Sequence, residues 1–245
     1  MRRSEAWQTA PMTPVQGARA RARAEITAAI KDEARRQLAA EGAAKLSLRA
    51  VARELGMVSS ALYRYFPSRD ELLTALIIDA YDAVGAAAEQ AHAAAVHAAP
   101  GDHLAQWTAA CRAVRAWALA HPHEYALLYG SPVPGYTAPR DTVGPAARVA
   151  LLLVGTARAA HEAEGVALPP LPDVLVPEAE RLAADVAPDL PPALAVALAS
   201  AWAQLFGLVS FEVFGQFHRV VEDRDAFFAA AAERLGREVG LLPRP

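Results

Sequence analysis

The sequence predicts an all-α fold in which a small amino-terminal domain of three helices precedes a larger helical domain. Three observations support this. Apolar residues recur at the three- and four-residue spacing of amphipathic helices, Pro- and Gly-rich segments separate these stretches, and alternating strand patterns are absent. With 245 residues, 54% of them hydrophobic, the chain can bury a large core. The expected boundaries are a flexible arm over 1–17, the small domain over 18–70 and the larger domain over 71–245.

Charge is divided unevenly between the two expected domains. Residues 1–70 carry 13 Lys and Arg against 7 Asp and Glu, whereas the remainder carries 11 against 20. A basic module on an acidic body is typical of a protein that binds phosphates at one end, although a solvated basic helix has the same composition. The single cysteine, Cys111, excludes an intramolecular disulfide, and the basic start lacks the apolar segment of a secretion signal. We therefore expect a cytoplasmic protein.

The first two helices follow from apolar spacing and capping residues. The first is expected over 18–41, because apolar side chains recur at every fourth position from Ile26 to Leu38 and Gly42 can end the helix. Ser47 is a favourable N-cap for a second helix, which the apolar spacing extends for about two turns.

A third, short helix is expected after the turn at Gly56, with Ser59 as its cap. Leu62 and Phe66 lie one turn apart and are expected to face the core, and Pro67 ends the helix. Because so short a helix cannot bury every face, its other side chains must form an exposed surface. These exposed side chains are expected to be Ser59, Ser60, Tyr63 and Arg64.

A short helix set across another by a glycine turn is the arrangement of the helix-turn-helix, whose second helix enters the major groove of DNA. Hydroxyl groups can bond phosphates or base edges, and Arg64 can pair with guanine through two hydrogen bonds. A helical hairpin with solvated polar side chains is the alternative. Upstream, Arg19 and Arg23 share a helix face and can contact phosphates or the minor groove, unless this terminus is frayed and solvated.

The segment "LSLRAVARELGMVSSALYRYFPSRDELLTAL" resembles the amino-terminal DNA-binding domain of the TetR family of bacterial transcriptional repressors. The resemblance covers residues 25–75 and includes the LY-x-x-F core, the following P-S-R and the leucines that open the next helix. It implies a phosphate clamp at Arg69. The chain differs from the family where Ser59, Ser60 and Ala61 replace a long polar residue, Gly and Thr, so its operator cannot be transferred from relatives. The implied DNA-contacting residues are Ser47, Arg49, Ser59, Ser60, Ala61, Tyr63, Arg64 and Tyr65.

A long fourth helix is expected from the cap at Ser68 to about His97. The resemblance implies that the larger domain binds a small effector between its helices and dimerises through the last two long helices. The further helices are expected over 102–120, 122–129, 142–164, 177–187, 189–217 and 223–241.

The stretch from Ala193 to Phe211 contains no charged residue and is long enough to span a bilayer. Its alanine content, its acidic flanks and the amphipathic helix that follows favour a subunit interface over a membrane span. We therefore expect a homodimer and no membrane partner. The expected interface residues are Trp202, Phe206, Gly207, Val209 and Phe214.

Aromatic residues cluster over 117–136, and aromatic side chains with a polar tip commonly line small-molecule cavities. Aromatic residues at helical spacing are also ordinary core residues, which is the alternative. The expected effector-binding residues are Trp117, Tyr125, Tyr129 and Tyr136.

No metal, cofactor or catalytic residue is expected. His121 and His123 flank a proline, but Glu124 is the only further ligand at a suitable spacing. Phosphate-loop, nucleophile-elbow and zinc-protease motifs are absent from the sequence. The sequence thus predicts a ligand-responsive repressor that binds near-palindromic double-stranded DNA as a dimer and is released by a small apolar or aromatic effector. An activator or a ligand-independent DNA-binding protein is the first alternative, and an all-helical enzyme is the second.

Overall fold

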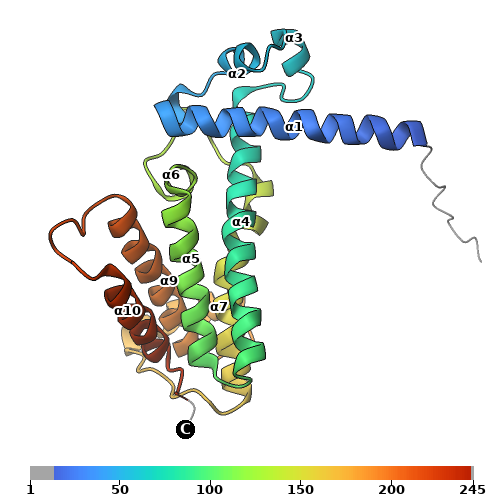
Figure 1. The fold of residues 1–245 in the computed structure, drawn as a ribbon. Coiled ribbons are helices and arrows are strands. Elements are labelled where there is room, and N and C mark those ends of the chain that lie inside the picture. Colours follow the sequence, from blue (N-terminus) through green and yellow to red (C-terminus); the bar gives the residue numbers. More distant parts are fainter. Residues whose placement is uncertain (1–13, 244–245) are drawn as a thin grey trace, which may run out of the picture. The chain divides into compact units, whose positions relative to one another are not determined.

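The computed structural model describes residues 14–243, and within them the fold is all-α, as the sequence predicts (Figure 1). The chain divides into an amino-terminal unit that ends at Leu73 and a carboxy-terminal unit that begins at Thr74. The helices are α1 (Pro14–Glu41), α2 (Leu48–Glu54), α3 (Ser59–Leu62), α4 (Arg69–Ala98), α5 (His103–Ala120), α6 (Pro122–Tyr129), α7 (Val143–Glu162), α8 (Val176–Val186), α9 (Pro192–Val213) and α10 (Arg224–Val239), with short 3-10 turns at Ala43–Lys45, Arg140–Thr142 and Asp173–Leu175.

Helix α1 begins at Pro14, so part of the expected flexible arm is helical, and residues 1–13 lie outside the described range. Ile30 and Leu38 are buried, whereas Ile26 is exposed, so only the carboxy-terminal half of α1 contributes to the core. Gly42 ends the helix with a φ of 80°, in the left-handed region that glycine adopts without strain.

Helices α2 and α3 are positioned by a cap and a tight turn. The Ser47 hydroxyl accepts a hydrogen bond from the Ala50 amide at 3.4 Å, so Ser47 caps α2 as predicted. After α2, the Met57 amide donates to the Ala52 carbonyl at 2.8 Å, and Gly56 takes a φ of 64°. The prediction that Ser59 caps α3 is wrong, because Val58 holds that position and Ser59 is the first helical residue.

The carboxy-terminal unit is a bundle in which α9 packs against α5, α7, α8 and α10, while α5 also packs against α10 (Figure 1). The contact between α5 and α10 is close because Gly236 has no side chain: a Cβ there would lie 2.6 Å from Leu104. Trp107 is fully buried beside it, and its indole nitrogen donates to the Ala232 carbonyl at 3.1 Å. Buried side chains from α4, α5, α6, α7, α9 and α10 form the core of this unit.

Two helical segments of the described chain, Arg140–Glu162 and Pro192–Val213, are long and apolar enough to cross a membrane. Core helices of globular proteins share this property. The helix expected over 189–217 is shorter, because Pro191 and Pro192 mark its start and Gly215, with a φ of 82°, follows its end. Because α9 is packed against four other helices, burial in the bundle accounts for part of its apolar composition, while Trp202 and Phe211 remain exposed.

Candidate DNA-binding surface and effector-binding hollows

The short helix α3 presents one buried side and one exposed side. Helix α3 ends at Leu62, so the prediction that it continues to Pro67 is wrong, and residues 63–65 form a turn instead. Leu62 is fully buried and Phe66 nearly so, as predicted, and they anchor α3 and this turn to the amino-terminal core. Tyr63 is 41% exposed, and Arg64 is exposed next to it. Hydroxyl, phenol and guanidinium groups therefore gather on one accessible surface, which we call the recognition surface. Its members are Ser59, Ser60, Tyr63 and Arg64.

The other expected DNA-contacting residues differ in accessibility. Arg49 is exposed on α2, and Arg19 is exposed on α1. Ala61 and Tyr65 are half-buried, so each offers only part of its surface to a partner. Ser47 is half-buried and its hydroxyl is engaged in capping α2.

Arg23 contacts the protein rather than projecting freely from α1. Its guanidinium carbon lies 5.0 Å from the centre of the Tyr65 ring, and Nη2 donates to the Arg64 carbonyl at 3.4 Å. This arrangement combines a cation–π contact with a weak hydrogen bond. The Arg23 side chain therefore links α1 to the residues that directly follow α3.

Arg69 also contacts the backbone of its own unit. Its Nη2 atom donates to the Ala43 carbonyl at 2.9 Å and to the Ala44 carbonyl at 3.3 Å, while Nη1 lies 3.5 Å from an Asp70 carboxylate oxygen. The guanidinium thus holds the 3-10 turn that precedes α2. A contact between Arg69 and phosphate remains a prediction, and the visible role of this side chain is structural.

The expected effector-binding aromatic residues divide between core and cavity. Trp117 and Tyr125 are buried in the core, and neither lines the two hollows described below. The Tyr125 hydroxyl donates to the Phe206 carbonyl at 3.1 Å and lies 2.9 Å from the Ser210 hydroxyl, and burial raises the pKa of Tyr125 to about 12. Tyr129 stacks on Phe206 with ring centres 4.4 Å apart. Trp117, Tyr125 and Tyr129 therefore belong to the core of the bundle, which was the alternative interpretation of the aromatic cluster.

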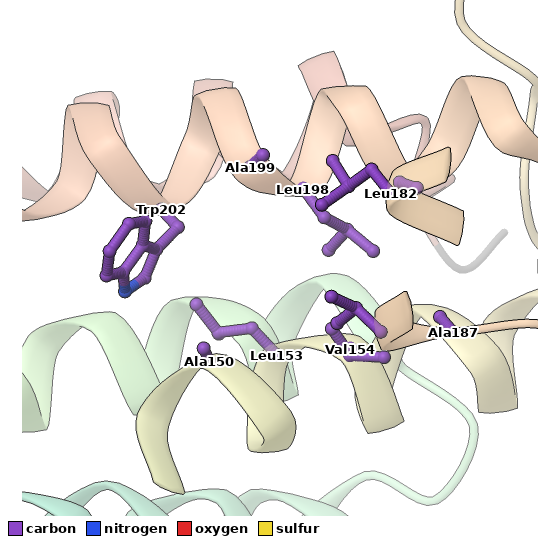
Figure 2. A pocket seen from close by; sticks show the side chains of 10 residues that line it. Ala150, Leu153, Val154, Leu182, Ala187, Leu198, Ala199 and Trp202 are labelled. Carbon is purple, nitrogen blue, oxygen red and sulfur yellow. The ribbon is translucent and has the colours of Figure 1, made fainter. Parts of the chain in front are cut away.

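The first hollow, which we call the apolar hollow, lies between α7, α8 and α9 and has a volume of about 240 Å³. Figure 2 shows Trp202 and Ala150 at one end of it and Ala187 at the other. No local pattern in the sequence indicates this hollow, because its walls come from three different helices that meet only in the folded bundle. Its lining residues are Ala150, Leu153, Val154, Leu182, Val186, Ala187, Ala195, Leu198, Ala199 and Trp202.

The second hollow, which we call the tyrosine hollow, has a volume of about 590 Å³ and is lined from α4, α6, α7, α9 and the loop after α6. Tyr136, the fourth expected effector residue, lines it, and its hydroxyl lies 2.9 Å from the Thr74 hydroxyl. Tyr81 lines it too. Burial, then the proximity of Tyr136, raises the pKa of Tyr81 above its ordinary value, which keeps the phenol neutral.

A salt-bridge network joins α4 to α7. Arg148 forms paired hydrogen bonds to the Glu89 carboxylate at 2.9 and 2.6 Å and a third to the Asp82 carboxylate at 2.8 Å. Gly85 lies beneath the arginine, since a Cβ there would meet Arg148 Nε at 2.8 Å. Arg148 therefore links α4 to α7, and α7 is a wall of both hollows.

The expected interface residues need correction. Val209 is fully buried and Phe206 is 7% exposed, so both pack within their own subunit and cannot meet a second chain. Trp202 and Phe214 are exposed, and a Cβ at Gly207 would contact nothing within 4 Å. Phe211 is also exposed, and the helical spacing of Gly207, Phe211 and Phe214 could have identified it from the sequence.

Among residues 14–243, no group of three or more His, Cys, Asp or Glu side chains is placed to hold a metal ion. His121 stacks on Trp117 with ring centres 5.2 Å apart, and its Nδ1 lies 3.0 Å from the Trp117 carbonyl. Cys111 is buried, and burial raises its thiol pKa to about 12. At neutral pH this thiol is protonated and poorly nucleophilic.

A helix-turn-helix with an exposed recognition surface, followed by a helical unit with internal hollows, defines a DNA-binding transcriptional regulator. The sequence profile of tetR-family bacterial regulatory proteins matches residues 30–76, and that of tetracyclin repressor-like carboxy-terminal domains matches residues 107–235. The chain belongs to the TetR family. It is a transcriptional regulator and not an enzyme.

Relatives cover most of the chain. The HTH-type transcriptional regulators Rv1816 of Mycobacterium tuberculosis and Mb1846 of Mycobacterium bovis are each 42% identical to it over 204 residues, which are 82% of this chain and 86% of theirs. Among solved structures, the regulatory protein SCO4313 matches with a TM-score of 0.71 and 36% identity over 88% of this chain and 97% of that chain. RolR, solved with the ligand resorcinol, is similar in fold alone, with a TM-score of 0.51 and 16% identity over 92% and 98% of the two chains.

Proposed function

We propose that this regulator is a cytoplasmic, homodimeric repressor that binds a near-palindromic operator and is released by a small apolar or aromatic effector. The recognition surface carries the proposal, since its hydroxyl, phenol and guanidinium groups stand exposed on α3 and the turn after it, while Leu62 and Phe66 of the same segment are fixed in the core. In a dimer, two such helices would enter successive major grooves about 34 Å apart.

The dimer is supported by the exposed apolar side chains near the end of the chain. Trp202, Phe211, Phe214 and Phe227 are each more than 40% exposed, on α9, just after it and on α10. A soluble monomer rarely exposes a contiguous apolar patch larger than a few hundred Å². A subunit interface formed by α9 and α10 would remove these side chains from water.

Release by an effector is supported by the contacts between α7, which lines both hollows, and α4. Helix α4 starts in the amino-terminal unit and continues through the carboxy-terminal unit, where Arg148 clasps it to α7. A ligand that moves α7 would also bias α4. A coupling free energy of about 1–3 kcal/mol would loosen the operator about 5- to 150-fold. The resorcinol bound by RolR is an example of a small phenol held by a chain of this fold.

The test begins with selection of binding sites from random DNA, followed by affinity measurements at several salt concentrations. Arg64→Ala should lower affinity, whereas Arg112→Ala, which removes an exposed arginine of α5, should not. If Arg64 reads a guanine, the loss should be about 1–3 kcal/mol per half-site, mainly on the selected operator. An equal loss on scrambled DNA would assign Arg64 to phosphate, and no loss on either DNA would contradict this surface as the DNA-binding site.

Repression is tested by a reporter gene placed behind the selected operator. Deletion of the regulator should raise expression, whereas an activator would show the reverse. A regulator without an effector would keep full operator affinity in the presence of every ligand that stabilises it.

A further inference from the structure

The apolar hollow and the tyrosine hollow share a wall. Ala150 of α7 and Trp202 of α9 line both of them. Figure 2 places these two residues together at one end of the apolar hollow, and both also line the tyrosine hollow, so the two hollows adjoin at this end. A ligand that passes the Trp202 indole would therefore occupy both spaces in sequence.

The two ends of this combined space differ in chemistry. The apolar hollow is lined by Ala, Val and Leu side chains and by one indole. The tyrosine hollow adds phenol and hydroxyl groups from Tyr81, Tyr136 and Thr142, whereas the Trp202 indole supplies the one polar side-chain atom among the described residues that line the apolar hollow. A molecule that fills both spaces needs an apolar body and one polar, hydrogen-bonding end.

Among the described residues that line the two hollows there is no Asp, Glu, Lys, Arg or His. The nearby charges of Arg148, Glu89 and Asp82 are already paired with one another. A charged ligand group would therefore be removed from water without a counter-ion, which is costly. The lining selects against carboxylates and ammonium groups.

We propose that the effector site binds an elongated, uncharged amphiphile, with its apolar chain in the apolar hollow and its hydrogen-bonding end beside Tyr81 and Tyr136. This assignment rests on the proposed effector response and names the ligand class of that same site. The volumes of the two hollows, about 240 and 590 Å³, lie together within the range of about 300–1,000 Å³ typical of small-molecule sites.

The first experiment uses calorimetric titration of the full-length, DNA-free protein with linear primary alcohols from hexanol to dodecanol. Each added methylene should tighten binding about fourfold while the apolar hollow fills, and the gain should stop when the hollow is full. Decanoate and decylammonium, matched in length to decanol, should bind at least about tenfold more weakly because their charge would be unpaired. Equal or tighter binding of either ion would overturn the assignment.

The second experiment locates the ligand with paired variants on α7. Ala150→Leu adds bulk where both hollows meet and should weaken decanol binding by about fivefold or more. Ala159→Leu makes the same change at an exposed position that lines neither hollow, and it should bind decanol like the unmodified protein. If Ala150→Leu also binds normally, the ligand does not pass this point and the proposal fails.

The polar end is tested separately with Tyr81→Phe and Tyr136→Phe. Loss of a hydrogen bond to the alcohol should lower affinity about 2- to 12-fold in at least one variant and leave the gain per methylene unchanged. If both variants keep full affinity for every alcohol, the hydroxyl end of the ligand is elsewhere and the orientation is wrong.

Operator release is measured independently, by adding decanol or decanoate to the protein bound to its selected DNA. Binding of decanol without release would contradict the effector response but leave the ligand class standing. Release by a charged ligand at lower concentration than by decanol would sustain the response and overturn the ligand class.

Discussion

Arg23 on α1 lies over the ring of Tyr65, with its guanidinium carbon 5.0 Å from the ring centre. The same guanidinium reaches the Arg64 carbonyl at 3.4 Å, so one side chain of α1 contacts two successive residues after α3. Arg64 belongs to the recognition surface. Arg23 is therefore placed to fix the orientation of that surface through the Arg64 backbone and the Tyr65 ring. A direct contact between Arg23 and DNA is a separate prediction.

We expect Arg23→Ala to lower operator affinity by loosening the chain after α3, at a cost of about 0.5–1 kcal/mol for the lost cation–π contact. If Arg23 only positions this chain, the dependence of affinity on salt should keep its slope. Loss of a phosphate contact would lower that slope by about 1 per subunit. Arg21→Ala, an exposed neighbour on α1, is the matched control. An Arg23→Ala protein with unchanged affinity and slope would show that neither role matters.

The proposed α9–α10 interface predicts a dimer at micromolar concentration. Gly207→Arg and Phe211→Glu should each produce monomers or aggregates, because each introduces a charge into an apolar contact. Leu151→Glu changes an equally exposed apolar residue on α7 and should leave the dimer intact. Sedimentation velocity measures the outcome. A wild-type monomer that binds a palindromic operator tightly would contradict the dimer.

Arg115 joins α5 to the end of α9 and the start of α10. Its Nε and Nη2 atoms donate to the Glu212 carboxylate at 2.6 and 2.7 Å, and its Nη1 donates to Asp225 at 2.7 Å. These hydrogen bonds, Glu212 foremost, raise the pKa of Arg115. Because the Glu212 side chain is only 5% exposed, removing its partner leaves a buried carboxylate unpaired.

Arg115→Ala should therefore lower the free energy of unfolding by about 3–5 kcal/mol, as measured by urea denaturation. Arg237→Ala removes the exposed ion pair with Glu233 on α10 and should cost no more than about 1 kcal/mol. Equal effects of the two substitutions would mean that water screens the Glu212 pair as well.

His92 on α4 lies 3.0 Å from the Thr156 hydroxyl on α7. Burial, then the charge of His103, lowers the pKa of His92 below its ordinary value. As the pH falls below about 6.5, the unfolded chain binds a proton that the folded protein resists, so stability falls. His92→Gln should reduce this loss, whereas His97→Gln, at an exposed site on α4, should not. Urea unfolding at about pH 7.5 and pH 5.5 measures the difference, and identical pH dependence in all three proteins would contradict it.

The local sequence determined the helices and the recognition surface, because these depend on contacts between near neighbours. The Ser47 cap, the Gly42 and Gly56 turns and the inward side chains of Leu62 and Phe66 follow from spacing alone. The errors in α3 concern its ends: the cap is shifted by a single position, and the helix stops at Leu62 instead of reaching Pro67. The exposure of Tyr63 and Arg64 follows from the burial of Leu62 and Phe66, because a segment this short packs on the core with one side only.

The tertiary structure decided which residues of α9 face inward and which aromatic residues line a cavity. The sequence of α9 is apolar on nearly every face, so its periodicity could not separate buried Val209 from open Gly207. Trp117 and Tyr125 have the residue types of a ligand site but are enclosed by neighbours from distant helices. The shared wall of Ala150 and Trp202 exists only because α7 and α9 pack together, and such a long-range contact leaves no local pattern in the sequence.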